Sequence, residues 1–262
     1  MERLDNKVAV VYGNGTIGAA VAVAFAKEGG TVFLAGRTPG KLAQIAARAA
    51  TGGNIIETVE LDALDETAVI QHLEEVVKEA GRVDISFNAI GIPQKGIQGL
   101  PIADLSLDSF FMPVATYLRS HFITAKAAVG QMLQQNSGVI LAHTPNASRI
   151  SPPFVGGMVP AWAAVEGLFR SLSVEYGASG IRAVYLNTTG IPETSLIDEV
   201  WEIHGKAHGI GFEQFHSVME GMTHRKRLTT LKELTDAAIF VASDEGSAIT
   251  GTIFNLTAGM IV

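Results

Sequence analysis

The chain has 262 residues, of which 47% are hydrophobic and 17% charged, with a formal net charge of −7 and no cysteine. The absence of cysteine excludes disulfides, thiolate metal sites and a cysteine nucleophile, and the acidic balance argues against nucleic acid as the main partner. The longest uncharged run, Val8–Ala26, is interrupted by glycines and polar residues, and the mixed-charge start does not look like a secretory signal. We therefore expect a cytoplasmic protein with no membrane partner.

Short β-branched runs alternate with alanine-rich helical stretches along the whole chain. Strands are predicted at Lys7–Tyr12, Thr31–Gly36, Asn54–Leu61, Val83–Asn88, Gly138–His143, Ile181–Asn187 and Gly251–Leu256. Helices are predicted at Ile17–Glu28, Gly40–Ala50, Asp65–Ala80, Asp108–Gln135, Val159–Tyr176 and Thr230–Ala242. Pro113 is expected to limit where the first turn of the long central helix lies.

This alternation predicts βαβ units and therefore a parallel sheet covered by helices on both faces. The expected fold class is α/β: a single doubly wound domain over residues 1–262, with a sheet of about seven parallel strands. We find no internal repeat or linker in the sequence.

A glycine-rich motif, G-x-G-x-x-G, lies between the first predicted strand and the first predicted helix. Gly13 permits the tight turn, Gly15 lets a pyrophosphate approach the backbone, and Gly18 lets the helix pack close to the sheet. The start of the helix adds free N–H groups and a positive dipole end. The predicted Rossmann-type phosphate loop consists of Gly13, Asn14, Gly15, Thr16, Ile17 and Gly18. The alternative is a tight turn that binds no ligand.

The end of the second predicted strand indicates which dinucleotide is bound. NAD-binding proteins place an acidic residue there for the ribose 2′-hydroxyl, but this strand ends without a carboxylate. Arg37 lies there instead, and its guanidinium suits a 2′-phosphate, with Thr38 and Lys41 near enough in sequence to assist. The sequence therefore predicts NADP(H) as the cofactor, unless Arg37 is only a solvated surface charge.

Several further segments resemble the short-chain dehydrogenase/reductase family in order and spacing. They are Leu61-Asp62-Ala63, Asn88 to Gly91, Glu166-Gly167-Leu168, Gly180-Ile181-Arg182, Arg227-Leu228 and Ile249-Thr250-Gly251. The glycine loop is one residue shorter than is usual in that family. The resemblance implies a homo-oligomer, a tetramer or a dimer, acting on a small-molecule substrate. It also implies further cofactor contacts at Asp62, Ala63, Asn88, Ala89, Gly91, Trp162, Gly190 and Thr194.

The family's catalytic residues are missing from the positions that the resemblance assigns to them. Met158 stands at the Tyr position, Trp162 at the Lys position, Pro145 at the Ser position and Tyr117 at the Asn position. Methionine has no ionisable proton and tryptophan has no cation. No Tyr lies between positions 150 and 166 and no Lys between 126 and 206, so the wider Tyr–Lys spacing of the family's enoyl reductases is excluded too.

Three residues are candidates for the missing acid–base chemistry. Tyr117 carries a phenol at a relay position, although a buried tyrosine more often packs with its hydroxyl bonded to backbone. His143 ends the fifth predicted strand, at the edge where such sheets bind ligands, and Thr144 stands beside the Ser position. A capped or solvated loop histidine is the alternative for His143.

The segment at about 191–226 corresponds to the substrate lid of the resembling family. Its methionines and aromatic residues suggest an apolar substrate, although ordinary amphipathic helices would show the same pattern. His204 and His208 are spaced to share a helix face, but Gly205 and Gly209 weaken the helix and no carboxylate completes a ligand set, so no metal is expected.

Three functions remain open from sequence. The first is a divergent NADP(H)-dependent oxidoreductase of an apolar carbonyl, alcohol or alkene. The second is a non-catalytic NADP(H)-binding protein. The third is a structural relic whose cleft is closed by Trp162.

Overall fold

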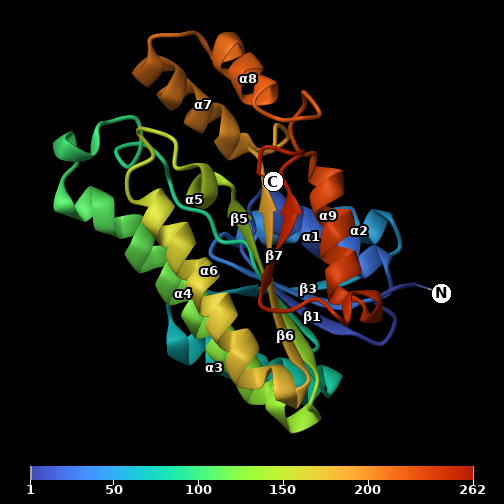
Figure 1. Ribbon diagram of the computed structural model, residues 1–262. Coiled ribbons are helices and arrows are strands. Elements are labelled where there is room, and N and C mark those ends of the chain that lie inside the picture. The colour runs from blue at the N-terminus through green and yellow to red at the C-terminus, as the bar shows by residue number, and fades with distance from the viewer. Residues whose placement is uncertain (1, 262) are drawn as a thin grey trace.

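The computed structural model describes residues 2–261, which form one seven-stranded sheet with helices on both faces (Figure 1). The strands are β1 (Val8–Tyr12), β2 (Thr31–Gly36), β3 (Ile56–Glu60), β4 (Ile85–Asn88), β5 (Gly138–Pro145), β6 (Ile181–Thr188) and β7 (Thr252–Leu256). Their order is β3-β2-β1-β4-β5-β6-β7 and every pair is parallel. The predicted α/β fold class with a doubly wound parallel sheet is confirmed.

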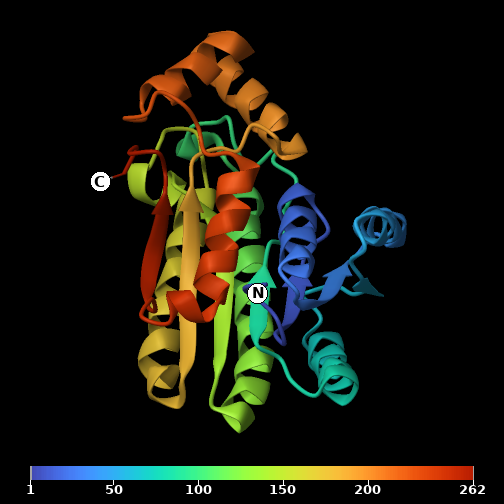
Figure 2. The ribbon, with the colours of Figure 1, turned by 90° about the vertical axis from the view of Figure 1, so that its right-hand side faces the viewer.

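The helices are divided between the two faces of the sheet (Figure 2). One face carries α1 (Thr16–Lys27), α2 (Pro39–Thr51) and α9 (Leu231–Ala242). The other carries α3 (Glu66–Ala80), α4 (Leu107–Gln135) and α6 (Met158–Tyr176). The single turn α5 (Ala147–Ile150) follows β5, and α7 (Ser195–His208) and α8 (Phe212–Gly221) lie beyond the carboxyl ends of the strands. No helix within residues 2–261 is long and apolar enough to cross a membrane.

Strand β1 shows why this sequence forms a covered parallel sheet. All five of its residues are buried. Val8, Val10 and Tyr12 pack in the cluster beneath α3, α4 and α6, whereas Ala9 and Val11 pack in the cluster beneath α1 and α9. A strand buried on both faces must be apolar at every position, as this one is. Burying each large side chain contributes roughly 1.5–3 kcal/mol.

Helix α4 overturns one sequence expectation. Pro113 does not limit the first turn, because the helix begins at Leu107 and continues through the proline. Proline costs an interior helix position about 3 kcal/mol, since it cannot donate a hydrogen bond. The Ser106 side chain offsets part of this cost by accepting a 3.1 Å hydrogen bond from the Ser109 amide, and α4 packs along α6.

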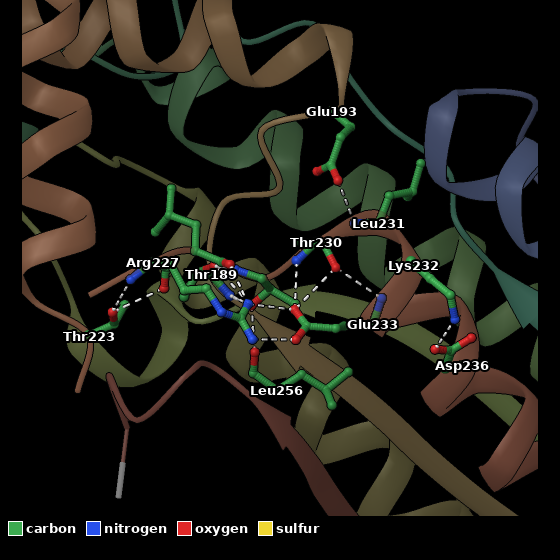
Figure 3. Close-up of polar contacts among 12 residues, drawn as sticks. Thr189, Glu193, Thr223, Arg227, Thr230, Leu231, Lys232, Glu233, Asp236 and Leu256 are labelled. Atoms are coloured by element: carbon green, nitrogen blue, oxygen red, sulfur yellow. Dashed lines mark hydrogen bonds and ion pairs between the residues drawn. The ribbon is translucent and has the colours of Figure 1, made fainter. Parts of the chain in front are cut away.

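Helices α7 and α8 are attached to the body through a polar network (Figure 3). The Arg227 guanidinium donates to both carboxylate oxygens of Glu233, at 2.9 and 2.5 Å. Thr230 caps α9, and the Glu233 carboxylate accepts a hydrogen bond from the Thr230 amide, which completes a capping box. The buried Thr229 amide donates to the Thr189 hydroxyl at 2.8 Å. We call residues 191–226 the α7–α8 segment. These hydrogen bonds hold the residues on either side of that segment close to each other beside β6.

Candidate functional site

A cavity of about 1130 Å³ lies at the carboxyl ends of the strands. Its walls come from the β1–α1 loop, the ends of β2 and β3, the loop after β4, the end of β5, and α6, α7 and α8. This edge, where the strand order reverses between β1 and β4, is where doubly wound sheets bind ligands.

The glycine loop has the geometry that its sequence spacing predicts. Gly13 has a φ of 106°, and a Cβ there would lie 2.6 Å from the Ala89 carbonyl oxygen. Gly18 does not line the cavity, because it packs against the Gly13 carbonyl group. Gly15 does line it, and a Cβ there would meet no atom within 4 Å. The loop is therefore closed on the sheet side and open on the cavity side.

The start of α1 is suited to bind an anion. The N-cap residue is Gly15, and no side chain caps the first amides of the helix. Those amides would otherwise be left without partners, and the helix dipole favours negative charge beside them. Thr16 and Ile17 line the cavity at this point. An open loop followed by an uncapped helix is the donor set that a pyrophosphate requires.

The far end of β2 presents positive rather than negative charge. Arg37, Thr38 and Lys41 are exposed and line the cavity. The side chain of Asn14 lies over Gly36 and donates a 3.1 Å hydrogen bond to the Thr38 carbonyl oxygen, so it holds this turn.

The β3 and β4 loops form the next part of the wall. Asp62, Ala63, Ala89 and Gly91 line the cavity. The Asp62 carboxylate accepts a 3.0 Å hydrogen bond from the Leu64 amide, which shapes its loop. Asn88 does not line the cavity. Its buried amide donates to the Thr124 hydroxyl and its oxygen accepts from the Ile90 amide, both at 3.1 Å, so it supports the wall from behind.

Two of the altered catalytic positions are filled by a pair of aromatic rings. Tyr117 and Trp162 lie with ring centroids 4.0 Å apart, and both line the cavity while being at least 95% buried. Burial raises the pKa of Tyr117, so its hydroxyl stays protonated at neutral pH. Pro145 and Met158 line the same region. This part of the cavity thus has an apolar wall where the family usually places a proton relay.

His143 is the titratable side chain in this region with a defined tautomer. The Thr188 hydroxyl donates to the Thr189 carbonyl oxygen at 2.7 Å, so its oxygen accepts from Nε2 of His143 at 2.8 Å. Nδ1 then carries the lone pair. Burial, and secondarily nearby His121, lowers the pKa of His143 to about 4. At neutral pH the ring is therefore uncharged and can accept a proton or a hydrogen bond.

Thr144, the third candidate, does not reach the cavity. It is fully buried and its oxygen accepts a 3.1 Å hydrogen bond from the Asn187 amide. Alternation along β5 explains this placement, because neighbouring residues of a strand point to opposite faces. His143 and Thr144 therefore cannot both face the same ligand.

The end of the cavity beneath α7 and α8 is mainly apolar. Gly190 and Thr194, in the segment that follows β6, line the cavity here. The apolar side chains are Ile197, Val200, Trp201, Ile210, Phe215, Val218, Met219 and Met222. Among residues 2–261, no three His, Asp or Glu side chains are grouped to hold a metal ion.

Sequence reasoning missed Gln94, Gln98 and Glu199, which also line the cavity. Gln94 and Gln98 lie in the irregular loop between β4 and α4, where no motif marks them. The two glutamines are four residues apart. This spacing was the one feature of the sequence that could have indicated a contact between their side chains.

Comparison with known proteins assigns the chain to one family. The family described as enoyl-(acyl carrier protein) reductase, a group of short-chain dehydrogenases/reductases, matches residues 11–261. An uncharacterized oxidoreductase, YxbG of Bacillus subtilis, is 29% identical over 100% of this chain and 93% of its own. A 3beta-hydroxysteroid dehydrogenase of Mediterraneibacter gnavus is 28% identical over 97% of this chain and 94% of its own.

Solved structures share the same fold. An NAD⁺-bound xylitol dehydrogenase has a TM-score of 0.90 at 23% identity, covering 98% of this chain and 100% of that one. Sorbitol-6-phosphate 2-dehydrogenase SrlD of Erwinia amylovora has a TM-score of 0.89 at 22% identity, covering 97% and 99%. Taken with the family match and the open glycine loop, these likenesses lead to one conclusion: the chain belongs to the short-chain dehydrogenase/reductase family, whose relatives are oxidoreductases that bind nicotinamide coenzymes.

Proposed function

We propose that the protein is an NADP(H)-dependent oxidoreductase acting on an apolar alcohol, carbonyl compound or alkene. The observation that carries the proposal is one cavity shared by the uncapped start of α1, by Arg37, by His143 and by the apolar side chains of α7 and α8. A bound nicotinamide would supply or accept the hydride. Two relatives are named as hydroxysteroid dehydrogenases, and apolar alcohols of that kind fit the same chemistry.

The preference for NADP(H) rests on the residues at the end of β2. Arg37 and Lys41 add two positive charges, and Thr38 adds a hydroxyl. A guanidinium binds a phosphate through two parallel hydrogen bonds. A ribose 2′-hydroxyl is instead bound by a carboxylate, which accepts its hydrogen bond. The cofactor contacts proposed here are those of the glycine loop and of Asp62, Ala63, Ala89, Gly91, Trp162, Gly190 and Thr194, all of which line the cavity except Gly18.

His143 is the proposed proton acceptor. When an alcohol is oxidised, its O–H bond breaks as the hydride leaves the carbon, and the proton passes to Nδ1 of His143. The Nε2 hydrogen bond to Thr188 holds the ring in the tautomer that this transfer needs. Burial lowers the pKa of His143 to about 4, so at physiological pH the ring is in its basic form but is a weak proton acceptor. Because a neutral Nδ1 has no proton to donate, alcohol oxidation is the proposed direction.

A second candidate is non-catalytic NADP(H) binding. It is favoured by Met158 and by the adjoining rings of Tyr117 and Trp162, which leave the family's acid–base positions without a group that ionises at neutral pH. In that case the protein would act as a sensor of the coenzyme, and Met219 and the other apolar residues of α8 would cover the bound molecule.

Thermal unfolding with NADPH, with NADH and without nucleotide is the deciding experiment. A ligand that binds only the folded state raises the melting temperature. We expect the larger rise with NADPH, followed by NADP⁺-dependent turnover of a panel of apolar alcohols. A larger rise with NADH contradicts the assignment of Arg37, and binding without any turnover supports the second candidate.

The proposal includes self-association in a reducing, cytoplasmic setting. Helix α4 exposes Phe111, Phe122 and Leu133, with 53%, 50% and 39% of each residue accessible. They are spaced by 11 residues, which returns to nearly the same side of a helix, so they form one apolar stripe. An exposed apolar stripe of this kind is typical of a subunit interface.

A further inference from the structure

A chain of three buried polar side chains joins α7 to the loop after β4. Nε2 of His204 lies 2.9 Å from Oε1 of Gln98. Nε2 of Gln98 donates to Oε1 of Gln94, and Nε2 of Gln94 donates to the Ile92 carbonyl oxygen at 2.6 Å. All three side chains line the cavity, and none of the three residues is more than 8% exposed.

The backbone carbonyl at one end fixes the direction of every hydrogen bond in this chain. A carbonyl oxygen can only accept, so the Gln94 amide nitrogen must face Ile92 and its oxygen must face Gln98. The Gln98 nitrogen must then face Gln94, which leaves its oxygen facing His204. His204 therefore carries its hydrogen on Nε2, and Nδ1 holds a lone pair.

The lone pair of His204 is available to a ligand. Burial, and secondarily the neighbouring His208, lowers the pKa of His204 to about 4, so the ring is neutral at physiological pH. Within residues 2–261, no side chain donates to Nδ1, and Nδ1 is not among the polar atoms that are buried without a partner. His204 lines the cavity, so a ligand bound there can approach this ring.

The other polar groups at this end of the cavity also accept hydrogen bonds. Glu199 presents a carboxylate, one oxygen of which already accepts from the Lys95 amide at 3.1 Å. Nδ1 of His208 donates to the His204 carbonyl oxygen at 2.8 Å, which leaves Nε2 of His208 free of that contact. Around them lie the rings of Phe215, at 5.7 Å from His204, and Trp201. Such a surface suits a hydrogen-bond donor on an apolar body and disfavours an anion.

We propose that the substrate is an apolar molecule with a second hydroxyl group, apart from the one that reacts, and that this hydroxyl donates to Nδ1 of His204. This assignment rests on the proposed function, because it adds a specificity contact to the same cavity. In this arrangement His143 on β5 faces the reacting group, and His204 on α7 binds the second hydroxyl.

Three matched probes test the proposal by calorimetric binding to the protein loaded with NADP⁺, with which a ketone cannot react. They are cyclohexylcyclohexanone, its derivative with a hydroxyl on the far ring, and the methyl ether of that derivative. A hydrogen bond worth roughly 1 kcal/mol predicts about fivefold tighter binding of the hydroxylated probe than of either other probe. Equal affinity for all three, or tighter binding of the ether, overturns the proposal.

A pair of substitutions locates the contact. His204→Phe keeps a flat ring beside Phe215 and should abolish the preference for the hydroxylated probe. His216→Phe is the matched control, since His216 is also on the α7–α8 segment and its ring lies beside that of Trp201 but does not line the cavity. It should leave the preference unchanged. A preference that persists in His204→Phe would place the contact elsewhere and contradict the assignment.

The wild-type probe comparison remains decisive if His204→Phe does not fold. Failure of the proposed function is read separately, as the absence of any NADPH-induced rise in melting temperature. The probes are then measured without nucleotide, and their order of affinity still tests the contact at His204.

Discussion

The tautomers of individual histidines determine what this cavity can do. At His143 and at His204, Nε2 faces an oxygen that can only accept a hydrogen bond in this arrangement, so the ring hydrogen is on Nε2. Burial keeps both rings neutral, so each offers an acceptor at Nδ1. We propose that these uncharged acceptors and the aromatic surface beside them stand in place of the family's tyrosine donor and lysine cation.

Arg37→Asp should distinguish the two nicotinamide coenzymes. Loss of the guanidinium and gain of a carboxylate should weaken NADPH binding by roughly 10- to 100-fold and leave NADH binding little changed. Fluorescence titration of each coenzyme measures the effect. Arg48→Asp is the matched control, because Arg48 is exposed on α2 and does not line the cavity. An equal loss for both coenzymes would show that Arg37 only supports the loop.

His143→Phe should remove turnover while sparing coenzyme binding. Without Nδ1 there is no group in place to accept the alcohol proton, so kcat should fall roughly 100-fold or more. The NADPH-induced rise in melting temperature should persist, which separates a chemical defect from a folding defect. Unchanged kcat would assign the proton transfer to another group.

At the scale of single elements, the sequence predicted most of the framework. Runs of β-branched residues marked all seven strands. The predicted helix Asp65–Ala80 is also found, with Asp65 as the N-cap of α3, where its side chain accepts from the Ala68 amide. The expectation for Pro113 was wrong. Helix propensity gives an average free-energy cost for proline, and the N-cap and the tertiary packing of α4 offset that cost. The glutamine chain could not be predicted, since Gln98 and His204 are 106 residues apart and meet only through tertiary packing.

The capping box of α9 should contribute measurably to stability. Thr230→Ala removes the side chain that accepts from the Glu233 amide and should lower the free energy of unfolding by about 1 kcal/mol. Thr38→Ala is the control, because Thr38 is the N-cap of α2 but makes no capping hydrogen bond. Urea unfolding of the nucleotide-free protein measures both. Equal losses would mean that the hydrogen bond at Thr230 adds nothing.

For the whole molecule, buried neutral histidines make stability depend on pH. Burial lowers the pKa of His121 to about 4, against an ordinary value of 6.5. The unfolded chain then binds a proton more readily than the folded one, so stability is lost as pH falls from 6.5 toward 4. At about pH 5 this costs about 2 kcal/mol for His121 alone.

Substituting His121 tests that dependence. His121→Phe should reduce the fall in the urea midpoint between neutral pH and about pH 5, because the unfolded variant has one fewer group to protonate. His143 and His204 act in the same direction, so part of the fall should remain. An identical pH dependence in wild type and variant would contradict the buried neutral state of His121.

The apolar stripe of α4 predicts an assembly of several copies. Phe122→Glu should lower the mass measured by sedimentation velocity, since a buried charge without a partner opposes association. Ile55→Glu, at a site 76% exposed and remote in sequence from α4, should leave the mass unchanged. A monomeric wild type would instead show that the stripe serves no contact between copies.

The chain contains two tryptophans, and both Trp162 and Trp201 border the cavity. Indole emission overlaps the absorption band of reduced nicotinamide, so a bound coenzyme would quench these residues by energy transfer. Intrinsic fluorescence thus becomes an optical reporter of occupancy that needs no label. Trp162→Phe and Trp201→Phe would divide the signal between the coenzyme end and the substrate end, and would show in real time which end fills first.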